Sequence, residues 1–131
     1  MAGKLIVKHF TSPDETRPFN HGRVDLIMTE GGSVMRAIFE PGWKWSNDVK
    51  PLAGTSSCQT AHSCYVLSGR MHLKMDDGSE AEMGPGDFAV IPPGHDAWVV
   101  GKEACVAFDY GGVQHYAEER AGTGRPATQQ H

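Results

Sequence analysis

The stretch Gly86-Asp87-Phe88-Ala89-Val90-Ile91-Pro92-Pro93-Gly94 places four apolar residues between two turn signals. The Gly-Asp pair favours a tight turn, and Pro-Pro-Gly cannot continue a strand because proline has no N–H to donate. We therefore expect a short buried strand at residues 87–91. Short apolar runs bounded by glycine or proline recur along the chain, and this arrangement is typical of a protein made of β-strands.

The other predicted strands lie on both sides of this stretch. They are residues 4–10, 24–29, 33–40, 58–67, 70–75, 79–83, 97–100 and 104–110. Asp77-Gly78, between two of them, is a strong hairpin signal. Residues 11–21 and 43–55 are expected to be irregular, and residues 118–131 are expected to form a mobile tail. The pattern predicts one all-β domain over residues 1–117 with an N-terminal arm, built as a sandwich or a barrel.

Composition and charge argue against several classes of function. The chain has 131 residues, which suits one domain, and its net charge of −4 with no basic run argues against nucleic-acid binding. The apolar run Leu5-Ile6-Val7 is too short for a signal peptide or a membrane span. Three cysteines without disulfide spacing indicate reduced thiols. We expect a cytoplasmic protein with no membrane partner.

Two motifs connect the chain to a known family. Residues 86–94 are similar to the second cupin motif, in which a Gly is followed by five residues, a Pro, any residue and a Gly. Residues 65–71 resemble the closing half of the first cupin motif, with Gly69 opening a turn. The sixteen residues between Gly69 and Gly86 suit small bacterial cupins. The resemblance covers residues 34–110 and implies a double-stranded β-helix, or jelly-roll barrel, with a metal ion at its mouth.

The metal-ligand positions implied by the resemblance are altered in this chain. The family's usual Glu falls on His62, its His-x-His pair on Ser56 and Cys58, and its second-motif His on Ala97. A displaced candidate, His95, lies two residues before Ala97. Residues two apart in an extended segment share a face, so Cys58 and His62 can both point into the barrel. We therefore predict a metal site made of Cys58, His62 and His95.

This ligand set has a definite chemical preference. A thiolate with imidazoles favours zinc, with iron or copper as alternatives, and three protein ligands leave one position open for Lewis-acid chemistry. The candidate catalytic side chains are Asp96 and Tyr65. Trp43, Trp45 and Trp98 are candidates for binding a cofactor or ligand in the pocket.

Several of these residues also have a purely structural interpretation. Cys58 can be a small buried hydrophobe, and His95 can be an exposed loop residue. Trp43 and Trp45 can cap the barrel end or form a dimer contact. His62 favours a site role, because an imidazole inside a strand needs polar partners.

Two functions remain open from the sequence. One is a small metal-dependent enzyme acting on a small organic molecule as an isomerase, lyase, hydrolase or, less readily, dioxygenase. The other is a non-catalytic cupin that binds or senses a small molecule. The resemblance also implies a homodimer, because small cupins pair their barrels through N-terminal strands and residues 5–10 can serve here.

Overall fold

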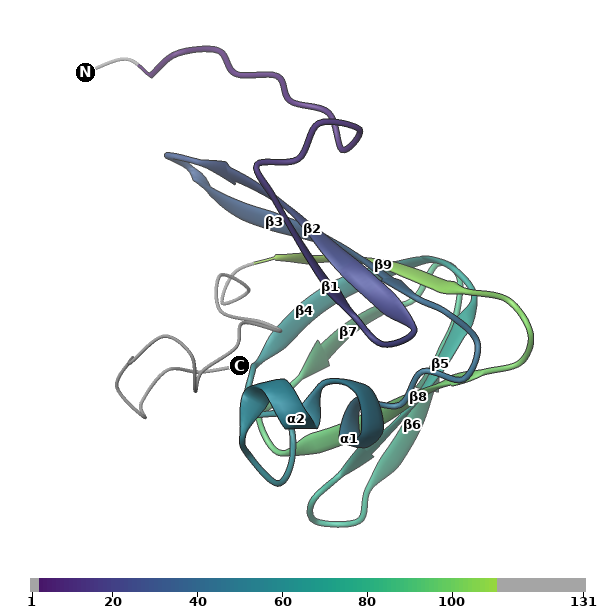
Figure 1. The fold of residues 1–131 in the computed structure, drawn as a ribbon. Helices are drawn as coiled ribbons and strands as arrows, with labels where there is room; N and C mark the ends of the chain where they lie inside the picture. The colour runs from purple at the N-terminus through teal and green to yellow at the C-terminus, as the bar shows by residue number, and fades with distance from the viewer. Residues whose placement is uncertain (1–2, 111–131) are drawn as a thin grey trace.

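The computed structural model describes residues 3–110, which form two antiparallel sheets and two short helices (Figure 1). The strands are β1 (Glu15–Phe19), β2 (Gly22–Thr29), β3 (Gly32–Phe39), β4 (His62–Ser68), β5 (Arg70–Met75), β6 (Glu80–Met83), β7 (Phe88–Ile91), β8 (His95–Val100) and β9 (Cys105–Tyr110). The helices α1 (Trp45–Asp48) and α2 (Lys50–Ala53) lie between β3 and β4. No helix of this part of the chain is long and apolar enough to cross a membrane.

The chain alternates between the two sheets in its second half. One sheet has the order β1-β2-β3-β9-β4-β7 and the other the order β6-β5-β8. The chain changes sheet after β4, β6, β7 and β8, which is the winding of a jelly-roll barrel. The first crossing depends on Gly69, which has a φ of 75° and lies so close to β9 that a Cβ atom would sit 2.2 Å from the Ala104 carbonyl oxygen. The predicted all-β jelly roll is confirmed.

Inward-facing residues of the two sheets enclose one core. In β4, for example, His62, Cys64 and Val66 are buried and point inward, whereas Tyr65 and Leu67 are exposed. The large buried side chains include Leu26, Met35, Trp43, Trp45 and Val66. This alternation decides which polar residues of each strand reach the barrel interior.

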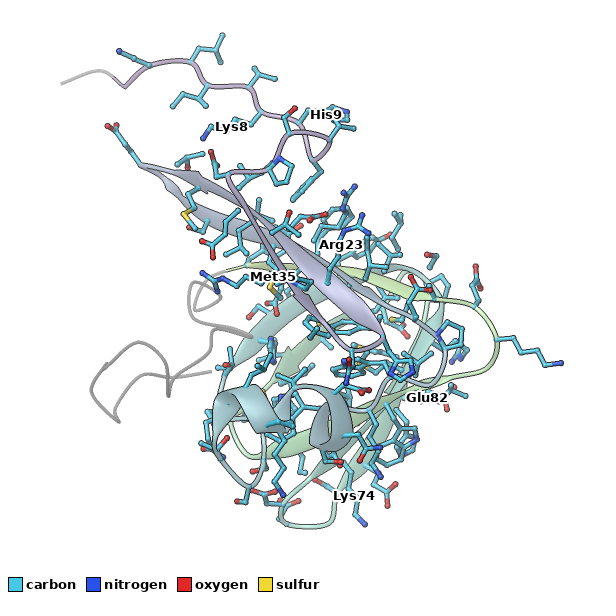
Figure 2. The ribbon with its side chains drawn as sticks, viewed as in Figure 1. Lys8, His9, Arg23, Met35, Lys74 and Glu82 are labelled. Carbon is cyan, nitrogen blue, oxygen red and sulfur yellow. The ribbon has the colours of Figure 1, made fainter. Side chains whose placement is uncertain are left out.

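The expectations for residues 4–10 and 11–21 are wrong. Residues 4–10 form no strand, and in Figure 2 Lys8 and His9 lie on a segment away from the barrel. Leu5 and Val7 are exposed there, so no strand pairs with this segment to bury them. The first strand is instead β1, within residues 11–21, where Pro18 is tolerated because β1 is an edge strand.

Three further expectations need correction. Residues 43–55 contain α1 and α2 rather than an irregular loop, and the strand expected at 58–67 begins only at His62. The strand at 87–91 is only half buried, because Phe88 and Val90 pair with the outward-facing Tyr65 and Ser63 of β4 and are exposed, whereas Ile91 faces inward. The predicted hairpin at Asp77-Gly78 is confirmed by the pairing of β5 with β6. The predicted tail at residues 118–131 lies outside the described residues.

Candidate metal centre

Three potential metal ligands meet inside the barrel. The Cys58 Sγ and one ring nitrogen each of His62 and His95 lie within 4.8 Å of one another, and all three residues are buried. Within residues 3–110 they are the one group of three or more such side chains with this geometry. The structure therefore brings together the three residues that the sequence predicted as ligands.

The backbone holds Cys58 against His95. The Cys58 N–H donates to the His95 carbonyl oxygen at 2.8 Å, and the Gly94 N–H donates to the Cys58 carbonyl oxygen at 2.7 Å. Gly94 has a φ of 93°, and a Cβ atom there would lie 2.9 Å from an Asp76 carboxylate oxygen. The last glycine of the 86–94 stretch thus sets the position of the ligand that follows it.

The second ring nitrogen of each histidine has its own acceptor. His62 Nδ1 donates to Asp109 Oδ2, and Asp109 Oδ1 accepts a hydrogen bond from the Ser63 N–H at 3.1 Å. His95 Nδ1 donates to the Pro92 carbonyl oxygen at 2.8 Å. These bonds fix both rings through their Nδ1 atoms, as is usual for histidines that bind metals through the other ring nitrogen.

Asp109 was not predicted from the sequence. It lies on β9, paired with Cys64 of β4 on one side and Met35 of β3 on the other. Cys105 and Ala107 precede it on the same inward face. An acidic residue on the apolar face of a predicted strand is a signal that could have identified it.

Cys58 and His62 shift each other's pKa. Burial raises the pKa of the Cys58 thiol, but hydrogen bonds from His62 and His95 more than offset this and lower it to about 6. Burial lowers the pKa of His62, but the carboxylate of Asp109 and the sulfur of Cys58 together raise it to about 10. The Cys58 thiolate, which is the form that binds metals, is therefore stabilised.

The distance between Cys58 Sγ and His62 Nε2 fits a metal ion with tetrahedral coordination. Metal–sulfur and metal–nitrogen bonds of about 2.3 and 2.0–2.1 Å at a tetrahedral angle place sulfur and nitrogen about 3.6 Å apart. Cys58 Sγ and His62 Nε2 are 3.6 Å apart. The residues present thus fit a small divalent ion without rearrangement of this pair.

The other two cysteines have no such environment. Burial, with the charge of Asp109 nearby, raises the pKa of Cys64 to about 12, and burial raises that of Cys105 to about 11. Both thiols therefore stay protonated at neutral pH, and their role is in packing.

The cluster opens onto a narrow cavity of about 40 Å³, which is room for a few water molecules. His62, His95 and Asp109 lie on its wall. The rest of the wall is apolar and is made of Met35, Ala37, Phe39, Trp43, Trp45, Cys64, Met71, Leu73, Met83, Ile91, Ala97 and Ala107. A ligand of this cavity is small and packs mainly against apolar side chains.

Comparison with known proteins agrees with this architecture. Residues 48–109 match the family model of the EutQ-like cupin domain. The chain contains a cupin domain. No curated protein sequence matches the chain significantly.

Solved structures resemble this cupin in fold. The polyketide cyclase RemF from Streptomyces resistomycificus is 19% identical with a TM-score of 0.58, over 82% of this chain and 78% of that chain. A protein of unknown function from Rhizobium leguminosarum is 17% identical with a TM-score of 0.54, over 82% and 97%. A variant of oxalate decarboxylase from Bacillus subtilis is 14% identical with a TM-score of 0.60, over 83% and 30%. At these identities the likeness concerns the fold.

The remaining predicted site residues of the cupin occupy two kinds of position. Trp43 and Trp45 line the cavity. Trp98 lies outside it, stacked on His72 with the Lys44 ammonium 5.1 Å from its ring centre. Its strand turns alternate side chains inward, so His95 and Ala97 are buried and Trp98 faces outward.

Neither predicted catalytic residue of the cupin faces the cluster. Tyr65 is exposed on the outer face of β4. The Asp96 carboxylate Oδ1 accepts hydrogen bonds from the N–H groups of Ser46 and Ala97, at 3.1 and 2.9 Å, and so ties α1 to β8. Ser56, the residue at a usual ligand position, is exposed. In this geometry the residues beside the cluster are Asp109, Trp43 and Trp45.

Proposed function

We propose that this cupin binds a divalent metal ion through Cys58, His62 and His95 and acts with it on a small organic molecule in the adjoining cavity. The observation that carries the proposal is the convergence of the three ligand atoms, with Cys58 Sγ and His62 Nε2 at a tetrahedral separation. Each imidazole is also oriented by an acceptor at its other nitrogen.

The donor set favours zinc. One thiolate and two imidazoles match the mixed sulfur and nitrogen sites that zinc occupies, with copper and iron as alternatives. Asp109 is the nearest carboxylate of the cavity wall, and it is engaged by His62 and the Ser63 N–H rather than offered as a ligand. This weakens the case for a two-histidine-one-carboxylate iron site and hence for a dioxygenase.

The reaction class follows from the open side of the cluster. When bound, the ion supplies Lewis-acid chemistry, which polarises a carbonyl group. Asp109 keeps the His62 ring in one orientation, and the apolar wall excludes water from the ligand. These roles suit an isomerase, lyase or hydrolase that acts on a compact molecule.

The test is the metal content of purified protein. We expect about one zinc equivalent in the unmodified protein, and at least about a 100-fold loss of affinity in Cys58→Ser, His62→Ala and His95→Ala, because losing a ligand costs more than the 10–100-fold typical of a ligand's hydrogen-bond partner. Matched controls are Cys105→Ser, a buried cysteine of β9, and His72→Ala, a histidine on the outer face of β5. Near-zero metal in all six proteins would refute the proposal.

A second candidate is a cupin that binds a small molecule without converting it. The narrowness of the cavity favours it, since a site that admits only a compact ligand has little room for a second reactant. A ligand that raises the melting temperature of the metal-loaded protein without being consumed would support this candidate over an enzyme.

The predicted homodimer is also a proposal. Leu5 and Val7 are exposed on the N-terminal segment, which leaves them available to a second copy of the chain. We expect sedimentation equilibrium to give a dimer that the double substitution Leu5→Asp, Val7→Asp dissociates. A monomer before substitution would contradict the proposal.

A further inference from the structure

Two tryptophans that line the metal cavity, Trp43 and Trp45, each carry a buried indole N–H group. Trp43 and Trp45 are 2% and 1% exposed, and both line the cavity together with His62 and His95. Within the described residues, neither Nε1 atom has a hydrogen-bond acceptor. Leaving a buried donor unpaired costs about 1–3 kcal/mol, so native proteins nearly always provide a partner. Residues 3–110 supply no such partner, which points to a bound molecule as the acceptor.

Both indoles are held firmly in place. The Trp43 ring packs on Phe39 with ring centres 4.2 Å apart. Trp45 is the first residue of α1, and hydrogen bonds hold the residues on either side of it. The Lys44 N–H donates to the Asp48 carboxylate at 2.9 Å, and the Ser46 N–H donates to the Asp96 carboxylate at 3.1 Å. Donors fixed in this way lose little freedom when a ligand binds, which favours a recognition role.

The remainder of the wall limits the kind of ligand. Among the described residues that line the cavity there is no Lys or Arg, and most are methionine, alanine, leucine, isoleucine or phenylalanine. A ligand here lacks a charged group of its own away from the metal position. It needs acceptor atoms for two N–H donors and an apolar body that packs against the methionines.

We propose that Trp43 and Trp45 donate hydrogen bonds to oxygen atoms of the substrate, and that the substrate is a compact, uncharged carbonyl compound with at least two oxygen atoms. This inference rests on the proposed function, because one of those oxygen atoms is assigned to the metal. The indole pair then orients the molecule relative to Cys58, His62 and His95, and it selects against hydrocarbons of the same shape.

The experiment follows the three indole N–H signals of ¹⁵N-labelled protein by NMR. Acetohydroxamate, a compact compound with two oxygen atoms, is titrated into the zinc-loaded protein, and acetamide into the metal-free protein. We expect the Trp43 and Trp45 signals to move downfield in both titrations. The Trp98 signal is the internal control, because Trp98 lies outside the cavity, and it should not move.

Substitution provides the second measurement. Trp43→Phe and Trp45→Phe keep an aromatic ring but remove the donor, and each should weaken acetohydroxamate binding about five- to tenfold. Trp98→Phe should leave it unchanged. If a phenylalanine variant does not fold, the signals of the unmodified protein decide alone.

The outcomes separate this inference from the proposed function. Metal binding with unmoved Trp43 and Trp45 signals overturns the inference and leaves the metal site intact. Indole signals that respond to acetamide in a protein that binds no zinc support the indole pair as an oxygen-binding site and overturn the proposed metal function.

Discussion

Two buried carboxylates, Asp25 and Asp109, lie on opposite faces of the same sheet. Each is 3% exposed. Asp25 pairs across the sheet with Arg36, which pairs with Phe108, whereas Asp109 pairs with Met35 and Cys64 in the neighbouring row. Adjacent rows of a sheet face opposite sides, so Asp25 is on the outer face and Asp109 on the inner face.

The partners of the two carboxylates explain their different roles. Asp25 accepts hydrogen bonds from Arg36 at 2.9 Å and Thr16 at 2.8 Å. These partners are a guanidinium group, which is always charged, and a hydroxyl group. Asp109 binds His62, whose other nitrogen faces Cys58. Burial of a charge therefore does not identify a functional site. The identifying feature is that the partner of the carboxylate itself contacts a further reactive group, as His62 contacts Cys58.

The largest expected effect comes from removing the partner of each carboxylate. His62→Ala and Arg36→Met should each lower the free energy of unfolding of the metal-free protein by about 3 kcal/mol, because each leaves a buried carboxylate without its main partner. Only His62→Ala should also lower zinc affinity, by more than about 100-fold. Urea denaturation and competition with a chromophoric chelator measure the two effects. Equal zinc affinity in both variants would contradict the proposal that only the carboxylate on the inner face supports a metal ligand.

A smaller effect is expected when the carboxylates themselves are changed. Asp109→Asn keeps the shape of the side chain but weakens its bond to His62, and it should reduce zinc affinity about 10–100-fold. Asp25→Asn is the matched control, since it makes the same change on the outer face, and its zinc affinity should equal that of the unmodified protein. Loss of affinity in both variants would indicate a general loss of stability rather than a role for Asp109 in orienting His62.

The same difference between faces explains what the sequence could predict. The motif at residues 86–94 located the barrel. Positions counted back from Gly69 led to Cys58 and His62, and the second motif led to His95 as a candidate displaced from Ala97. Asp96 and Trp98 are one and three residues after His95 in β8, so a strand that turns His95 inward turns both of them outward. Tyr65 is three residues after His62 and follows the same rule. Consistent use of the alternation would have excluded all three from the cavity.

Other features depend on pairings that are distant in the sequence. Asp109 is 47 residues from His62, and only the register between β4 and β9 brings them together. The exposure of Phe88 and Val90 follows from the pairing of β7 with β4, which places them beside the outward-facing Tyr65 and Ser63, and an apolar run gives no information about which of its residues face outward. Residues 4–10 have strand composition but no partner strand, so their composition alone misled the prediction.

The smallest expected effect concerns the pH dependence of the outer carboxylate. Burial raises the pKa of Asp25, but the hydrogen bonds from Arg36 and Thr16, together with the charge and hydrogen bond of Arg23, outweigh burial and hold the pKa below 3.8. A carboxyl whose pKa is lower in the folded state contributes stability above the unfolded-state value, and this contribution is lost as the pH falls through the folded-state value. The difference in unfolding free energy between the unmodified protein and Asp25→Asn should therefore stay constant from pH 7 to about 4 and shrink at lower pH. Urea titrations at a series of pH values measure it. A difference that instead grows as the pH falls from about 6 to 4 would mean that the folded state holds Asp25 with a raised pKa, and that its partners on the outer face do not stabilise the charged form.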